Sequence, residues 1–139
     1  MTIALSSSIL AILVVTVINF IIGWLWYGPL FGRQWTSAVG ISRRELDYDK
    51  KKGMAGKMMG AFVLSLVTSY VTAIFIKASG ASTVLSGAFV GVLIWLGFFM
   101  TTSLGAVIWE HKKKSLFYIN ACYDLVRFII IGAILAIWL

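Results

Sequence analysis

The chain has few charged residues, one proline, one cysteine and one histidine among its 139 residues. Charged residues make up 12% of the sequence, whereas they make up roughly a quarter of a typical soluble domain. Hydrophobic residues make up 60%, and the mean hydropathy is +0.96. This composition excludes an ordinary soluble domain and indicates an integral membrane protein. The single proline and the long apolar runs also disfavour a β-barrel, whose strands appear as alternating segments of about ten residues.

The scarcity of reactive side chains excludes several kinds of site. Cys122 is the only cysteine, so a disulfide within the chain and a cysteine-rich metal site are excluded. His111 is the only histidine and lies beside Glu110 in a lysine-rich segment, where we expect a solvated side chain. No phosphate-binding loop, nucleophile elbow or zinc-helix spacing is present. We therefore expect no enzymatic activity, no cofactor and no metal.

Four apolar runs approach or exceed the roughly 20 residues that a membrane-spanning helix needs. They cover about residues 3–27, 58–76, 84–109 and 116–139. The sequence predicts an all-α integral membrane protein, with residues 1–139 forming a single antiparallel bundle of four transmembrane helices. No Lys or Arg precedes Arg33, and the first run is longer than the core of a secretory signal, so we expect it to remain in the mature protein.

The basic residues predict the orientation of this bundle. Seven lie in the connection 31–57 and three at 112–114, whereas the connection 77–83 contains Lys77 alone. Lys and Arg concentrate in cytoplasmic loops, so both basic connections are predicted to be cytoplasmic and both termini to lie outside. We expect a multi-pass protein of the cytoplasmic membrane, the inner membrane of a bacterium. No nucleic-acid partner is expected, because the charge is split over two loops without a motif; the lipid bilayer is the expected partner.

The 31–57 connection is the largest predicted loop. Ser42 and Glu45 have the spacing of a capping box, which predicts a short surface helix over residues 43–51. Docking of a cytoplasmic partner on this loop is an alternative to simple solvation. Residues 78–82 are rich in Gly and Ser, which predicts a tight turn between the second and third spans.

Aromatic residues gather where the first span ends. Gly28 and Pro29 are expected to end the helix, because proline has no amide donor and disfavours helical geometry before it. The rings are interpreted as an interfacial anchor, since Trp and Tyr prefer the head-group level. A slot for a lipid or a quinone is the alternative. The predicted motif comprises Trp24, Trp26, Tyr27, Pro29, Phe31 and Trp35.

Small residues at four-residue spacing predict helix contacts. Gly56 and Gly60 begin the second span, and Gly87 and Gly91 lie in the third. Such pairs let two backbones approach closely, which promotes helix association in lipid. The pattern predicts tight packing and leaves open whether the neighbour lies in the same chain or in another copy.

Counting depth from the predicted cytoplasmic ends reveals a polar layer. A position eight residues inward lies about 12 Å deep, and every span has a polar residue there. On the fourth span, three- and four-residue spacing also places a polar group on one face. The candidate layer comprises Asn19, Ser65, Thr101, Thr102, Asn120, Tyr123, Asp124 and Arg127.

Two interpretations of this layer remain open. In the first, Asp124 and Arg127 neutralise each other, bond to Asn19 or the threonines, and fix the register of the bundle. A lone charge costs roughly 2.5–3.5 kcal/mol at the centre of an inserting helix, and pairing relieves much of this cost. In the second, the layer lines a water-filled path in which Asp124 binds a cation or proton, or Arg127 an anion.

The chain resembles the bacterial membrane family known as domain of unknown function 1761. The resemblance rests on the segment Trp26–Gly32 with Trp35 and Gly40, and on Leu116, Phe117, Ile119, Asn120, Tyr123, Gly132–Ala136 and Trp138. It implies a small four-helix membrane protein without an established role. The positions carried over are the aromatic Gly-Pro segment, Glu110, Asn120 and Tyr123. The Asp124 and Arg127 pair is not part of the family pattern, and Cys122 stands where a small residue such as Gly is expected.

These observations favour a non-enzymatic membrane protein that acts by self-association or as a subunit of a larger membrane complex. A homo-oligomer is expected because a 15.3 kDa bundle is too thin to enclose a wide pore. The alternative is a small homo-oligomeric channel or carrier for ions, protons or small solutes. A water-filled passage to Asp124 would favour transport, and a dry, fully paired layer would favour assembly.

Overall fold

The computed structural model describes residues 5–40, 42, 44–45, 48 and 55–139, and within these residues it contains helices and no strands. The segments are α1 (Leu5–Leu25), η1 (Trp26–Leu30), α2 (Gly32–Val39), α4 (Ala55–Ser79), α5 (Val84–Ile94), η2 (Trp95–Met100), α6 (Thr101–Trp109) and α7 (Lys114–Trp138). Four helical stretches are long and apolar enough to cross a membrane: Ser8–Leu30, Ala55–Ser79, Val84–Trp109 and Lys114–Trp138. The predicted all-α membrane architecture is confirmed. The single domain, the antiparallel order of all four spans and the side of each terminus stay predictions.

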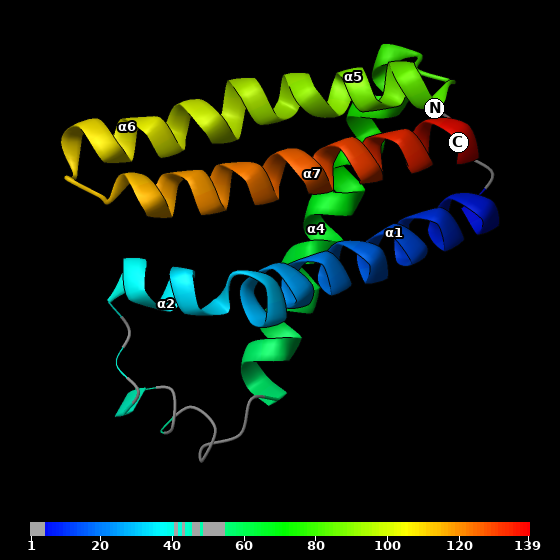
Figure 1. Cartoon of the computed structure of the whole chain (residues 1–139). Coiled ribbons are helices and arrows are strands. Elements are labelled where there is room, and N and C mark those ends of the chain that lie inside the picture. Colours follow the sequence, from blue (N-terminus) through cyan, green and yellow to red (C-terminus); the bar gives the residue numbers. More distant parts are fainter. Residues whose placement is uncertain (1–4, 41, 43, 46–47, 49–54) are drawn as a thin grey trace.

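Helix α7 lies at the centre of the arrangement (Figure 1). The path α5–η2–α6 runs along one flank of α7, and α1 lies along the other. Helix α4 crosses the other helices steeply and contacts α1, α5 and α7. The start of α1 and the end of α7 lie at one end of the bundle, and the turn between α6 and α7 lies at the other.

Glycines allow α5 and α7 to touch through their backbones. A Cβ atom added at Gly87 would collide with the carbonyl of Gly132, and one added at Gly91 would collide with the carbonyl of Phe128. Only residues without a side chain permit this approach. The partner moves back along α7 from Gly132 to Phe128 as α5 advances from Gly87 to Gly91, so these two helices run in opposite directions. The predicted pair on α5 thus lies at a contact within the chain.

The buried core is concentrated near the end of the bundle where α7 finishes. Its members are Ala11, Val15, Ala73, Ile76, Ile94, Phe128, Ile131, Leu135 and Ala136. By contrast, every residue of α4 from Ala55 to Leu64 is exposed. The second half of α4 therefore packs in the core, while its first half diverges from α7 and crosses α1, where the rings of Phe62 and Phe20 meet edge to face (Figure 1).

Two π-helical segments, η1 and η2, interrupt the first and third spans. In η1 the amide of Phe31 donates to the carbonyl of Trp26, five residues back, at 2.9 Å. The prediction that Gly28 and Pro29 end the helix is wrong, because the chain remains helical to Leu30. A proline ring clashes with the carbonyl four residues earlier in an α-helix. A local π-helical turn accommodates this defect.

The connection after the first span contains a helix that was not predicted. Helix α2 ends at Val39 and is followed by Gly40, whose φ of 84° is left-handed. One bond of the capping box predicted for the surface helix is observed: the amide of Glu45 donates to Ser42 Oγ at 3.2 Å. Residues 43, 46–47 and 49–51 of that prediction lie outside the described residues.

Candidate functional site

Asp124 and Arg127 form an ion pair on α7. Nε and Nη2 of Arg127 each lie 2.8 Å from Oδ1 of Asp124, and the two side chains are only 13% (Asp124) and 12% (Arg127) exposed. The guanidinium carbon also lies 4.7 Å from the ring centroid of Phe128, 5.0 Å from that of Tyr123 and 5.4 Å from that of Phe99. Aromatic faces attract a guanidinium at these distances. The pair is therefore neutral as a unit and held among rings.

Asn120 and Tyr123 join α7 to the end of the first span. The hydroxyl of Tyr27 donates to Oδ1 of Asn120 at 2.6 Å. The rings of Tyr27 and Tyr123 meet edge to face with their centroids 5.0 Å apart. Such ring pairs add to the stability gained from burial. The two α7 positions carried over from the family resemblance thus contact the aromatic segment directly, whereas Glu110, the third single position, is exposed at the end of α6.

The other members of the aromatic motif lie around this contact. The indole of Trp26 donates to the carbonyl of Ile119 at 3.0 Å and packs against the ring of Phe31 at a tilt of 41°. The Trp35 ring lies 5.2 Å from that of Tyr27. Pro29 lies within η1, and Trp24 is 55% exposed. Two rings of the predicted interfacial motif, those of Trp26 and Tyr27, therefore contact α7 and hold the first span against it.

Thr101 and Thr102 do not join the predicted polar layer. Both are exposed, and their hydroxyls donate to the carbonyls of Gly97 and Phe98 in their own span, each at 2.8 Å. A helix places residues of equal depth on any of its faces, so depth did not establish that these hydroxyls point inward. Asn19 and Ser65, by contrast, are buried in the bundle.

Asn19 is a fully buried amide without a hydrogen-bond partner. Among the described residues, neither Oδ1 nor Nδ2 has one, and the same is true of the buried hydroxyl of Ser69. The expected bond from Asn19 to the ion pair is not present. An unsatisfied buried polar group costs about 1–3 kcal/mol, so each instance in a folded protein needs an explanation. Sequence reasoning placed Asn19 in the layer but gave no sign that it would lack a partner.

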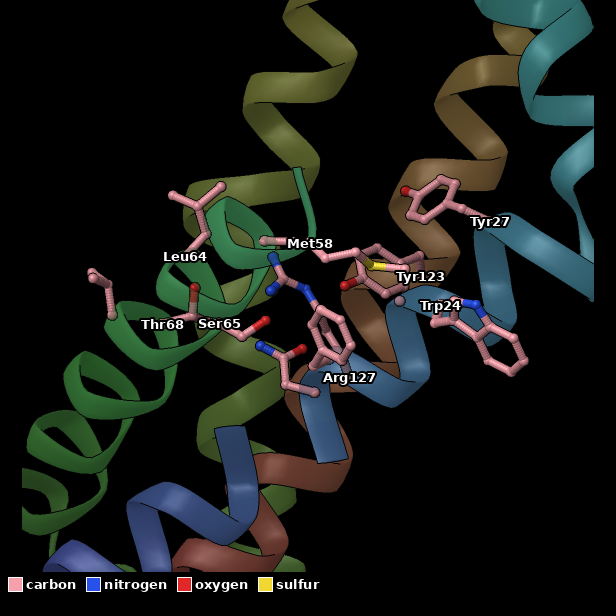
Figure 2. Close-up of a pocket in the computed structure, with 13 residues that line it drawn as sticks. Trp24, Tyr27, Met58, Leu64, Ser65, Thr68, Tyr123 and Arg127 are labelled. Atoms are coloured by element: carbon pink, nitrogen blue, oxygen red, sulfur yellow. The ribbon is translucent and has the colours of Figure 1, made fainter. Parts of the chain in front are cut away.

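A cavity of ≈ 550 Å³ lies between α1, α4 and α7, beside Asn19. This volume is within the range of about 300–1,000 Å³ typical of small-molecule sites. Figure 2 shows Ser65, Tyr123 and Arg127 turned toward the same space. The lining combines four aromatic rings, from Phe20, Trp24, Tyr27 and Tyr123, with polar side chains from Asn19, Ser65, Thr68 and Arg127. No sequence signal indicated this cavity, because it depends on how α4 diverges from its neighbours.

The remaining candidate groups are not brought to this cavity. Cys122 is exposed with a free thiol, and His111 has a left-handed φ of 55° in the turn between α6 and α7. Within the part of the chain that the structure describes, nothing lies within 4 Å of a Cβ position built on Gly56 or Gly60. Among the described residues, no group of three His, Cys, Asp or Glu side chains could hold a metal ion.

Comparison with known proteins gives a family but no activity. A family model described as "Protein of unknown function (DUF1761)" matches residues 10–136. No curated protein and no solved structure matches the chain.

Proposed function

The chain belongs to DUF1761, a family of unknown function, and we propose that it is a non-enzymatic protein of the cytoplasmic membrane that acts by associating with further copies of itself. The observation that carries this proposal is the contrast between the two predicted glycine pairs. The backbone of α7 packs directly against Gly87 and Gly91, whereas Gly56 and Gly60 on α4 meet no other described residue. One pair is used inside the chain, and the other remains available.

The open pair belongs to a continuous strip along α4. Gly56, Gly60, Val63 and Val67 follow four- and three-residue spacing, so they lie on one side of the helix. Val63 is 50% and Val67 55% exposed. We call these four residues the outer α4 face. They lie roughly opposite the buried positions of the same helix, Ser65, Ser69, Thr72, Ala73 and Ile76.

Two copies of the outer α4 face complement each other. A two-fold axis brings the same patch of each copy together, so each glycine meets a glycine or valine of the partner. In lipid, close backbone approach and van der Waals contact drive such association. A subunit of another membrane protein could use the same strip, and in that case the purified chain alone would remain monomeric.

The test is the oligomeric state of the full chain in lipid nanodiscs, measured by native mass spectrometry. We expect the wild type to exceed the monomer mass of 15.3 kDa, and the double variant Gly56→Leu, Gly60→Leu to shift to the monomer. Gly97→Leu is the matched control, because Gly97 is also exposed with nothing within 4 Å of its Cβ position, but on η2. A monomeric wild type, or equal dissociation of the control, would refute self-association through this face.

A small channel or carrier is the second candidate, and the cavity beside Arg127 favours it. The ion pair is evidence against transport, because the carboxylate of Asp124 is already paired with the guanidinium of Arg127 at 2.8 Å. Flux of protons, small cations and halides into liposomes containing the purified protein separates the two functions. Selective flux that is lost in the Asp124→Asn variant would support transport over assembly.

A further inference from the structure

The cavity between α1, α4 and α7 is lined by a group that the proposed association does not explain, the amide of Asn19, which has no partner among the described residues. We propose that this cavity binds a quinone from the membrane, meaning a neutral, planar, oxygen-bearing ring with an apolar tail. This inference goes beyond the proposed association. Of the outer α4 face, only Val67 also lines the cavity, whereas Gly56, Gly60 and Val63 do not. The association test changes the two glycines and the binding test changes other residues, so either proposal can fail without the other.

The position of the cavity gives access from the bilayer. It lies where the first half of α4 diverges from α7, and Met58, Ala61 and Leu64 of that half line it. All three are exposed, as is Trp24 on the opposite wall. A ligand dissolved in lipid can therefore enter laterally, with its tail left among the acyl chains.

The polar wall offers hydrogen-bond donors to an oxygen acceptor. Asn19 is 0% exposed, and its Nδ2 has no partner. Arg127 binds Asp124 through Nε and Nη2, and Nη1 makes no hydrogen bond within the described part of the chain. The hydroxyls of Ser65 and Tyr123 line the same space. Carbonyl oxygens of a ring would satisfy donors of this kind, and Oδ1 of Asn19 would accept from the hydroxyl of a reduced ring.

Charge at this depth favours a neutral head group. Asp124 balances Arg127, so a carboxylate or phosphate ligand would add an uncompensated negative charge to the site. An uncompensated charge at membrane depth is costly. Anionic fatty acids and phospholipid head groups are therefore disfavoured against a neutral acceptor.

The aromatic wall favours a flat ring over a saturated head group. Phe20, Trp24, Tyr27 and Tyr123 all line the cavity. Aromatic rings pack against other flat conjugated rings in offset or edge-to-face geometry, with a gain beyond simple burial. A glycerol or sugar head group would use little of this surface.

A purely structural explanation of Asn19 competes with this proposal. Ser65 and Ser69 of α4 are also buried, so a rotation of the Asn19 side chain toward them would brace α1 against α4 without any ligand. That explanation predicts loss of stability on replacing Asn19 and no quinone binding. The two alternatives therefore differ in a direct binding measurement.

The experiment is a titration of the full chain in nanodiscs with decylubiquinone, followed by quenching of tryptophan fluorescence. We expect saturable quenching, most of which disappears in Trp24→Phe because Trp24 lies on the cavity wall. Asn19→Ala and Tyr123→Phe each remove polar groups that line the cavity. Each should weaken binding about tenfold, the change expected from one lost hydrogen bond in a buried site.

Two variants of α4 distinguish a loss of quinone binding from a loss of folding. Ala61→Phe fills the cavity from an exposed position and should abolish saturation, whereas Ala78→Phe, exposed on the same helix outside the cavity, should leave it unchanged. Quenching that rises linearly with quinone, or is equal in both variants, would overturn the proposal. Displacement of the quinone by equimolar laurate would also overturn it, because the site would then accept an anionic chain.

Discussion

Replacing Gly91 by alanine tests whether α5 and α7 depend on backbone contact. The added methyl group would collide with the carbonyl of Phe128, which can move only with its helix. Overpacking of this kind costs about 1–3 kcal/mol. We expect a cost in the upper part of that range, because no flexible side chain can give way.

The matched control is Gly105→Ala on α6, where nothing lies within 4 Å of the added Cβ. Alanine is a better helix former than glycine by about 1 kcal/mol, and this gain is common to both variants. The difference in their free energies of unfolding therefore isolates the clash.

Reversible unfolding in mixed micelles, followed by circular dichroism, measures both free energies of unfolding. We expect Gly105→Ala to equal or exceed the wild type and Gly91→Ala to fall below Gly105→Ala by about 2–3 kcal/mol. Equal stability of the two alanine variants would show that α5 and α7 are not in backbone contact. The close packing of these two helices would then be refuted.

Three further predictions concern the polar groups of the spans. Asp124→Asn or Arg127→Gln leaves a lone charge and should cost about 2.5–3.5 kcal/mol of unfolding free energy. The double variant should lose less than the sum of the two single losses, and additive losses in the same micelle assay would contradict the ion pair. Tyr27→Phe removes the hydrogen bond to Asn120 and should cost about 0.5–1.5 kcal/mol of unfolding free energy. A double-mutant cycle with Asn120→Ala measures this as a coupling free energy, and zero coupling would count against the bond. Thr101→Val and Thr102→Val should each change stability by less than about 0.5 kcal/mol, because both side chains are exposed; a larger loss would place them in an interface.

Properties that depend on the linear order of residues were predictable from the sequence. The third span was expected at 84–109 and is observed at Val84–Trp109, because length and hydropathy alone define a segment that crosses lipid. The Asp124–Arg127 contact also follows from the sequence, since residues three apart share a face of one helix. Both inferences require no knowledge of neighbouring helices.

Properties that depend on the direction of a side chain were not predictable. Thr101 comes directly after η2, and a π-helical turn accommodates an extra residue, so it rotates the next helical residues by about 100°, the angle of one α-helical residue. The unpartnered Asn19 and the cavity beside it arise from the divergence of α4, which hydropathy does not encode. The candidate site was therefore predicted in part of its residue content and not in its geometry.

The tryptophans that begin the two π segments restrict how this protein can move. The indole of Trp26 donates to the carbonyl of Ile119 and that of Trp95 to the carbonyl of Ala121, at 3.0 and 2.8 Å. These acceptors are two residues apart, about 200° around the axis of α7, and the donors approach from its two flanks (Figure 1). A rotation of α7 about its axis would break at least one of these bonds. We expect α1, α5 and α7 to behave as one rigid frame, leaving a tilt of the loosely held half of α4 as the motion of lowest energetic cost.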